Sequence, residues 1–179
     1  MLSAATPRRP RLSFRAVNRR GDAGFEPGMQ RHHLLPRQLL SQHCFGHLFE
    51  AIGRERLGFD DFRHNGLLLP ASGESAARMG LPLHRGPHRT YNGLVAERVG
   101  QIERDWSRIR LGDPDNAMGQ ALMRLTLLQR ALRRRLLGAD QRPLKLNKMD
   151  PLGADLDFAE LDAMAESLWT GTITVADPL

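Results

Sequence analysis

Two histidines four residues apart, His84 and His88, stand before a long amphipathic stretch and constrain what this chain can fold into. Gly86 and Pro87 lie between them, and proline is favoured at the first position of a helix, where its missing N–H would have no partner. We therefore predict a helix over residues 87–109. Because imidazole is a common metal ligand, two rings at the start of one helix can point at one ion. This pair predicts half of a metal site.

A second histidine pair, His32 and His33, lies on a short apolar run that ends at Pro36. We predict a strand over residues 30–35. Successive side chains of a strand point to opposite faces, so one ring of the pair can face the metal site while the other faces away. All seven histidines of the chain fall between positions 32 and 88. That confinement indicates a metal or acid/base site.

The order of the elements between these pairs predicts a strand, strand, helix arrangement. Asn65-Gly66 before a short apolar run is typical of a tight turn that leads into a strand, over residues 67–70. Residues 71–81, rich in small side chains, are predicted to form a loop. The helix over residues 87–109 should bury one apolar face, formed by Tyr91, Leu94, Val95, Val99, Ile102 and Trp106.

Another helix is predicted over residues 37–52, where apolar side chains recur at helical spacing. It contains His43, Cys44 and His47, which offer an alternative set of metal ligands. Such side chains on an amphipathic helix more often lie at the surface or at the edge of the core. Together with His64 they remain candidates for completing a closed, four-ligand zinc site.

The last third of the chain is predicted to be mainly helical. Asp113 followed by Pro114 is typical of a cap and the first position of a helix, and an apolar stripe continues from there towards Gly138. A further helix is predicted over residues 158–168 and an edge strand over residues 170–175.

The excess positive charge of the chain lies at its N-terminus. The first 20 residues hold six arginines and no acidic residue, whereas the remaining 20 basic residues are matched by 20 acidic ones. A flexible basic segment suits an anionic partner, and Arg15, Arg19 and Arg20 are candidate nucleic-acid contacts. A solvated arm without a partner and a cleavable targeting sequence are the alternatives.

Cysteine content and hydropathy limit the class of protein. The single cysteine, Cys44, excludes an internal disulfide and a zinc finger with several cysteines. No apolar run approaches the length needed to cross a membrane, so we expect a soluble protein without a membrane partner. A length of 179 residues suits one domain with an appendage.

Three motifs follow one another in the chain: QRHHLLP from residue 30, NGLLLP from residue 65 and LHRGPHRTYN from residue 83. In this order they resemble the AHH family of the HNH/endonuclease VII superfamily of nucleases, although Arg31 stands where the family has alanine. The resemblance covers about residues 25–110. It implies an α+β fold with a small ββα-metal module and additional helices (25–112). The arginine-rich flexible tail (1–24) and the mainly helical extension (113–179) lie outside the resemblance and are predicted from the residues themselves.

The resemblance also implies a role for each histidine of the two pairs. His32, His84 and His88 would hold one divalent ion, magnesium or manganese, with zinc as the alternative. His33 would be the general base that activates water. Asn65 would orient the His33 ring or tie its loop. The candidate phosphate contacts beside the ligands are Arg85 and Arg89.

The predicted function is a metal-dependent endonuclease that hydrolyses phosphodiester bonds in DNA, with RNA as the alternative substrate. A non-catalytic, zinc-stabilised module that binds nucleic acid is the second hypothesis. The third is a nuclease toxin whose partner is a neutralising immunity protein, since AHH-type nucleases resemble the toxic tips of secreted bacterial proteins. A cytoplasmic location is expected, with secretion as an effector as the alternative.

Overall fold

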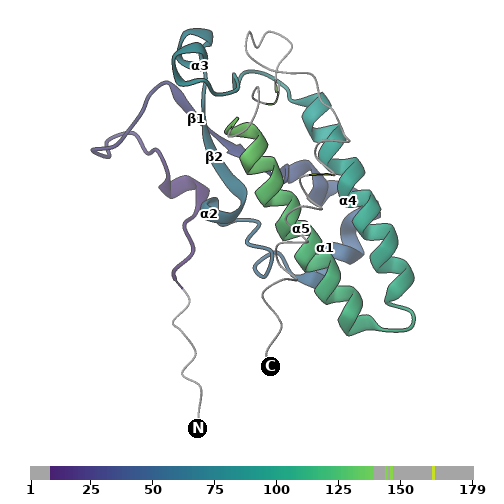
Figure 1. The fold of residues 1–179 in the computed structure, drawn as a ribbon. Coiled ribbons are helices and arrows are strands. Elements are labelled where there is room, and N and C mark those ends of the chain that lie inside the picture. The colour runs from purple at the N-terminus through teal and green to yellow at the C-terminus, as the bar shows by residue number, and fades with distance from the viewer. Residues whose placement is uncertain (1–8, 139–143, 145, 147–162, 164–179) are drawn as a thin grey trace, which may run out of the picture.

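The computed structural model describes residues 9–138, 144, 146 and 163. Two antiparallel strands lie beside several helices (Figure 1), so the predicted α+β class is confirmed. The predicted helix over residues 158–168 and the strand over residues 170–175 lie outside the described residues. The described elements, in chain order, are η1 (Phe14–Ala16), β1 (Met29–His33), η2 (Arg37–Ser41), η3 (His43–Phe45), α1 (Gly46–Ile52), α2 (Phe62–Asn65), β2 (Gly66–Pro70), α3 (Gly73–Met79), α4 (Arg89–Ile109) and α5 (Pro114–Leu136).

The sheet fixes the direction of both residues of the first histidine pair. In the antiparallel register of β1 and β2, His32 lies opposite Leu67 and His33 lies opposite Gly66. Residues directly opposite each other share a face of the sheet, so His32 lies on the face of buried Leu67 and His33 on the other face. The predicted strands are therefore confirmed, with β1 ending at His33.

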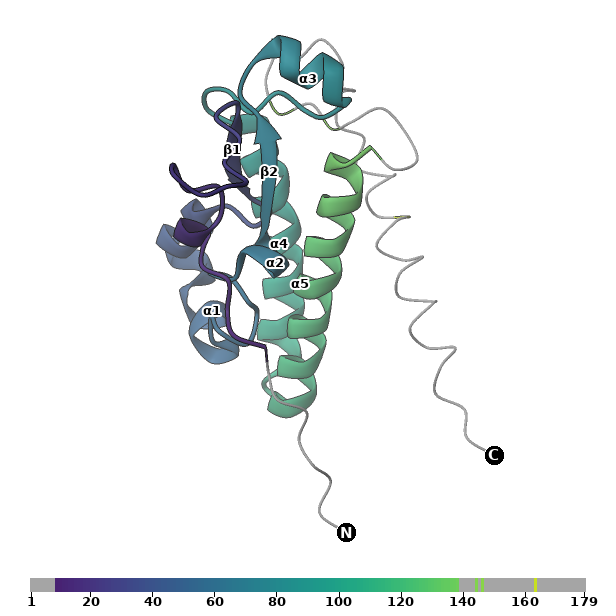
Figure 2. The same ribbon diagram turned by 90° about the vertical axis from the view of Figure 1, so that its left-hand side faces the viewer.

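Helices α4 and α5 are the two longest elements, and they lie side by side in both views (Figures 1 and 2). Their buried side chains join those of the strands in one hydrophobic cluster, which includes Val95, Val99, Leu125 and Leu132. None of the described helices combines the length and the apolar character that a membrane span requires. Helix α5 thus supports the same core as the sheet that carries the histidines.

The single helix predicted over residues 37–52 is wrong. The chain forms η2 and η3, then α1, and Gln42 between the first two has an extended backbone with ψ of 115°. Leu39 and Leu48 are nine positions apart, which is about two and a half turns of an α-helix, so one straight helix would point them in opposite directions. Both are buried, because the break at Gln42 turns Leu39 back into the core.

The loop predicted over residues 71–81 is also wrong, because it contains α3. The Ser72 side chain accepts the backbone N–H of Ser75 at the start of this helix, and Ala76 packs into the protein. Gly80 ends it in the left-handed conformation, with φ of 63°. Serine before the helix and glycine after it are both signals that the sequence contains.

Two predicted boundaries also shift. The tight turn expected at Asn65-Gly66 is replaced by the short helix α2, which ends at Asn65 and is capped by the Asp61 side chain. The long helix begins at Arg89 instead of residue 87, and His88 occupies the position before its first residue. His88 therefore projects from a helix end, and His84 from the segment that leads to it.

Candidate active site

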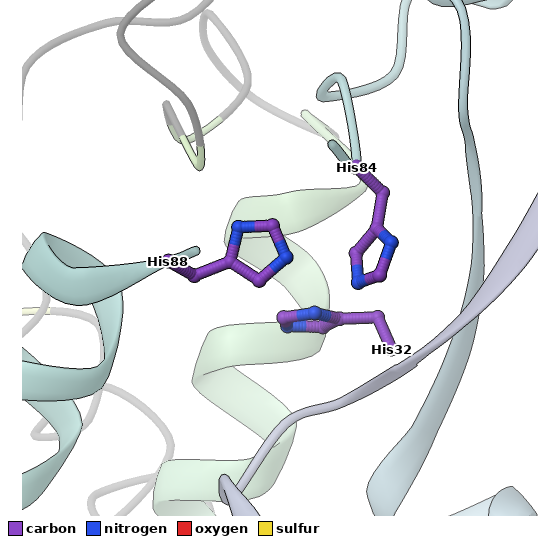
Figure 3. Close-up of side chains that lie close together, drawn as sticks. All are labelled: His32, His84 and His88. Atoms are coloured by element: carbon purple, nitrogen blue, oxygen red, sulfur yellow. The ribbon is translucent and has the colours of Figure 1, made fainter. Parts of the chain in front are cut away.

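Three histidines from separate parts of the chain converge on one space (Figure 3). His32 comes from β1, His84 from the segment after α3, and His88 from the start of α4. One ring nitrogen from each histidine lies within 4.8 Å of the corresponding nitrogens of the other two, and the ring centroids are 4.5–5.6 Å apart. The structure brings together the three residues expected to bind metal, and they are termed the three-histidine cluster below.

Burial of His32 indicates that this cluster is built for a cation. The His32 side chain is 3% exposed, and its Nε2 has no hydrogen-bond partner in the described part of the chain. A buried polar atom without a partner is costly, and a metal ion would use this lone pair. Ligands that share an ion at bonds of about 2.1 Å lie about 3.4 Å apart, so rotations that move the rings by about an ångström complete the site. The three residues therefore fit a divalent ion.

Electrostatics keep the rings of the cluster neutral, which is the form that binds a metal. Burial lowers the pKa of His84 to about 4, with a further decrease from the charge of His88. Burial also lowers the pKa of His88, and it holds the pKa of His32 well below its usual range. At neutral pH the nitrogen lone pairs are consequently not taken up by protons.

Two hydrogen bonds orient the rings of His84 and His88. Nδ1 of His84 lies 2.9 Å from Oε1 of Gln30, and Nδ1 of His88 lies 3.3 Å from the carbonyl oxygen of Leu146. Both oxygens only accept, so each Nδ1 donates and each Nε2 keeps its lone pair for a ligand. Sequence reasoning missed both partners. Gln30 could have been found, because it lies two positions before His32 and thus on the same face of β1.

His33 lies on the other face of β1 and has a separate environment. Its ring stacks on Phe14 at 3.7 Å between centroids and 3° between planes, and Phe62 meets Phe14 edge-on at 5.1 Å. Partial burial and then the charge of Arg37 lower the pKa of His33 to about 4, against an opposing effect of Asp60. The ring is therefore neutral at pH 7 and can accept a proton.

The stack on His33 depends on a glycine in the neighbouring strand. Gly66 lies opposite His33, and a Cβ atom at this position would overlap the ring of Phe62. Because glycine leaves this space open, Phe62 can lie against the sheet and support Phe14. The Asn-Gly pair is typical of a turn, but here its glycine makes room for this aromatic group.

Phe14 belongs to the segment that the sequence assigns to a flexible tail, yet the described part of this segment is held in several places. Arg31 Nη1 donates to the carbonyl oxygen of Phe14 at 2.8 Å. The Leu12 carbonyl accepts the Phe62 backbone N–H at 2.8 Å, and Ser13 forms a bridge with Asp61. Arg31, which replaces the family's alanine, thus holds the segment that covers His33.

Asn65 is fully buried, and its side chain joins three parts of the chain. Its Oδ1 accepts the Leu35 N–H at 2.7 Å and the Gln129 amide at 3.3 Å, while its Nδ2 donates to the carbonyls of Leu35 and Phe59. Among the described residues, none of these bonds goes to the His33 ring. These hydrogen bonds fit the predicted alternative in which the Asn65 side chain holds the loop after His33 in place.

The predicted arginine contacts are all exposed, as phosphate contacts need to be: Arg15, Arg19, Arg20, Arg85 and Arg89. The alternative metal ligands are exposed too, namely His43, Cys44, His47 and His64. Histidine, cysteine, aspartate and glutamate side chains can all bind a metal ion. Among the described residues, those that lie close enough together to share one ion are the members of the three-histidine cluster. The alternative residues do not complete its shell.

An α+β module with a three-histidine cluster and a separate histidine on the adjoining strand position suits a metal-dependent nuclease. Residues 13–123 match AHH, described as a nuclease family of the HNH/ENDO VII superfamily with a conserved AHH motif. The match spans more than half of the chain, so the protein belongs to this nuclease family, and nucleic acid is its substrate class. No curated protein and no solved structure matches it.

Proposed function

We propose that the protein is an endonuclease that hydrolyses phosphodiester bonds of DNA, with RNA as the alternative substrate. The observation that carries this proposal is the placement of His32 and His33 on opposite faces of β1, one in the three-histidine cluster and the other outside it. In an in-line displacement the attacking water and the leaving oxygen lie on opposite sides of phosphorus. Separate positions for the metal site and the base suit this geometry.

His33 acts as the general base. Its neutral ring accepts a proton from water as the water oxygen attacks the phosphorus atom. The bond from phosphorus to the 3′-oxygen breaks, which leaves a 5′-phosphate on one product and, after protonation from solvent, a 3′-hydroxyl on the other. A base is most effective when its pKa is near the working pH. The pKa of about 4 belongs to the free protein, and the negative charge of a bound phosphodiester next to the ring raises it towards neutrality.

His32, His84 and His88 hold one divalent ion, magnesium or manganese in function. When bound, the ion supplies electrostatic stabilisation of the charge that develops on the phosphate and the leaving 3′-oxygen. Three imidazoles also bind zinc tightly, so the ion in a purified sample can differ from the working one. Asn65 keeps the loop after His33 in place and acts as a positioning residue.

Cleavage of supercoiled plasmid DNA tests this function. The protein should nick plasmid with magnesium or manganese, stop in EDTA and recover when the metal is restored. His88→Ala should lose both activity and bound metal, because it removes one ligand. His43→Ala is the matched control, since it removes an exposed histidine outside the cluster. Metal-independent cutting by the wild type, or full activity of His88→Ala, would reject the proposal.

A further inference from the structure

A hollow in the protein surface has a volume of about 480 Å³ and shares no lining residue with the three-histidine cluster. Its walls come from the start of the described chain and from the segment between α1 and β2. Five arginines line this arginine hollow: Arg9, Arg11, Arg54, Arg56 and Arg63. We propose that it binds backbone phosphates of the nucleic-acid strand on which His33 acts, an inference that rests on the proposed function.

The walls of the arginine hollow carry a net positive charge, because its five arginines outnumber its acidic residues. Three acidic residues, Glu55, Asp60 and Asp61, accompany the five arginines. Asp60 is paired with Arg54 at 2.9 Å, and Asp61 accepts two backbone N–H groups at 3.0 and 3.4 Å. In the described part of the chain, no carboxylate pairs with the other four arginines. The hollow therefore carries charge that an anion can neutralise.

Two of these arginines are held by neutral acceptors, which fix the side chains without cancelling their charge. Arg63 Nη1 donates to the Pro10 carbonyl oxygen at 2.7 Å, and Arg56 Nη1 lies 3.4 Å from the sulfur of Met118. Both side chains are exposed to solvent. A guanidinium presents a planar set of N–H donors that matches two phosphate oxygens. The hollow thus offers several such donors around one space.

The hollow adjoins the face of the sheet that carries His33. Phe62, whose neighbours in the chain line the hollow, contacts Phe14, and Phe14 stacks on His33. A strand that passes His33 therefore brings its neighbouring phosphates to the hollow, which helps to hold the scissile bond in register with the base.

The test compares two triple variants of the full chain. Each is made in a His33→Ala background and assayed in EDTA, so that binding is measured without cleavage. The hollow variant carries Arg9→Gln, Arg11→Gln and Arg56→Gln. The control variant removes three exposed arginines elsewhere: Arg78→Gln, Arg104→Gln and Arg130→Gln. Arg63 is left in place because it also holds Pro10, and thermal unfolding verifies that both variants are folded.

Fluorescence anisotropy with a labelled single-stranded DNA gives the binding constant at several salt concentrations. The hollow variant should bind at least about tenfold more weakly, and its log-log salt slope should fall by about 2, because each phosphate contact on a single strand contributes about 0.7. The control should stay within about threefold, since isolated exposed charges are screened. Equal losses in both variants, or an unchanged slope in the hollow variant, overturn the proposal.

The two proposals fail in different ways. If the wild type binds DNA through the hollow but does not cut it, the proposed function fails and the binding site stands. The same three arginine substitutions in the wild-type background should raise KM while leaving kcat within about threefold, because they remove binding shared by the ground and transition states. If this variant cuts DNA with an unchanged KM, the proposed phosphate-binding role of the hollow is wrong and the nuclease function stands.

Discussion

Replacing Asn65 by alanine is expected to destabilise the fold by about 3 kcal/mol. The side chain is 0% exposed, and four hydrogen bonds connect it to Leu35, Phe59 and Gln129. Alanine leaves the Leu35 N–H, two carbonyls and the Gln129 amide without this partner. A buried polar group that loses its partner costs about 1–3 kcal/mol, and carbonyls and a movable glutamine are at the low end. Partial relaxation keeps the total near 3 kcal/mol.

Urea denaturation followed by circular dichroism measures this loss. The urea concentration at the midpoint of unfolding should fall. The dependence of the free energy of unfolding on urea concentration should stay unchanged, since the same surface is exposed on unfolding. Asn116→Ala is the matched control, because Asn116 is exposed and its side chain bonds to a neighbour on its own helix; its effect should stay within about 0.5 kcal/mol. A wild-type midpoint for Asn65→Ala would refute the interpretation of Asn65 as a structural tie and favour a direct role at His33.

Three further predictions concern the metal site, the base and pH. Gln30→Ala should weaken manganese or zinc binding about tenfold in titration calorimetry, because it frees the His84 ring, whereas the exposed Gln38→Ala should not. Phe14→Ala should lower kcat up to about tenfold without changing the metal content, because a tenfold change in rate corresponds to the free energy of one aromatic stack. Phe14→Tyr should retain activity, since it keeps the ring. The metal-free protein should lose thermal stability as pH falls from the ordinary histidine pKa of about 6.5 towards about 4, because the unfolded chain binds more protons in that window. The loss should be smaller in His84→Gln; an equal pH dependence would contradict the lowered pKa of His84.

The parts of the structure that sequence reasoning predicted depend on short-range patterns. The two strands follow from apolar runs bounded by proline and glycine, and the opposite directions of His32 and His33 follow from the period of two in a strand. The capped helix from Pro114 is predicted by Asp113 in front of it. The two histidine pairs predicted a shared metal site, because each pair is positioned by local geometry. The choice of His32 over His33 as the third ligand came from the resemblance to the AHH family.

The parts that were missed depend on contacts between distant residues. A helical pattern over residues 37–52 did not reveal the break at Gln42, which places Leu39 and Leu48 in one core. Phe14 lies in a segment rich in arginine, and nothing near it in the chain indicates a stack on His33. Gln129, 64 positions from Asn65, is equally invisible to local patterns. These contacts exist only once the strands and the long helices have packed together.

The division of the chain at residues 24 and 112 stays a prediction. The family match runs from residue 13 to residue 123 and crosses both positions. Phe14 covers His33, and α5 supplies both core side chains and the Gln129 amide. We therefore expect nuclease activity to need the segment that holds Phe14 and the whole of α5.

The most direct test of the mechanism is the rate of DNA cleavage by His33→Ala, measured together with its metal content. Removal of a general base should lower the rate by at least about a hundredfold, while the three-histidine cluster still binds its ion. Metal content measured by mass spectrometry should thus equal that of the wild type. Wild-type cleavage by His33→Ala would contradict the role of this histidine. Loss of the metal along with activity would contradict the separation of base and metal site.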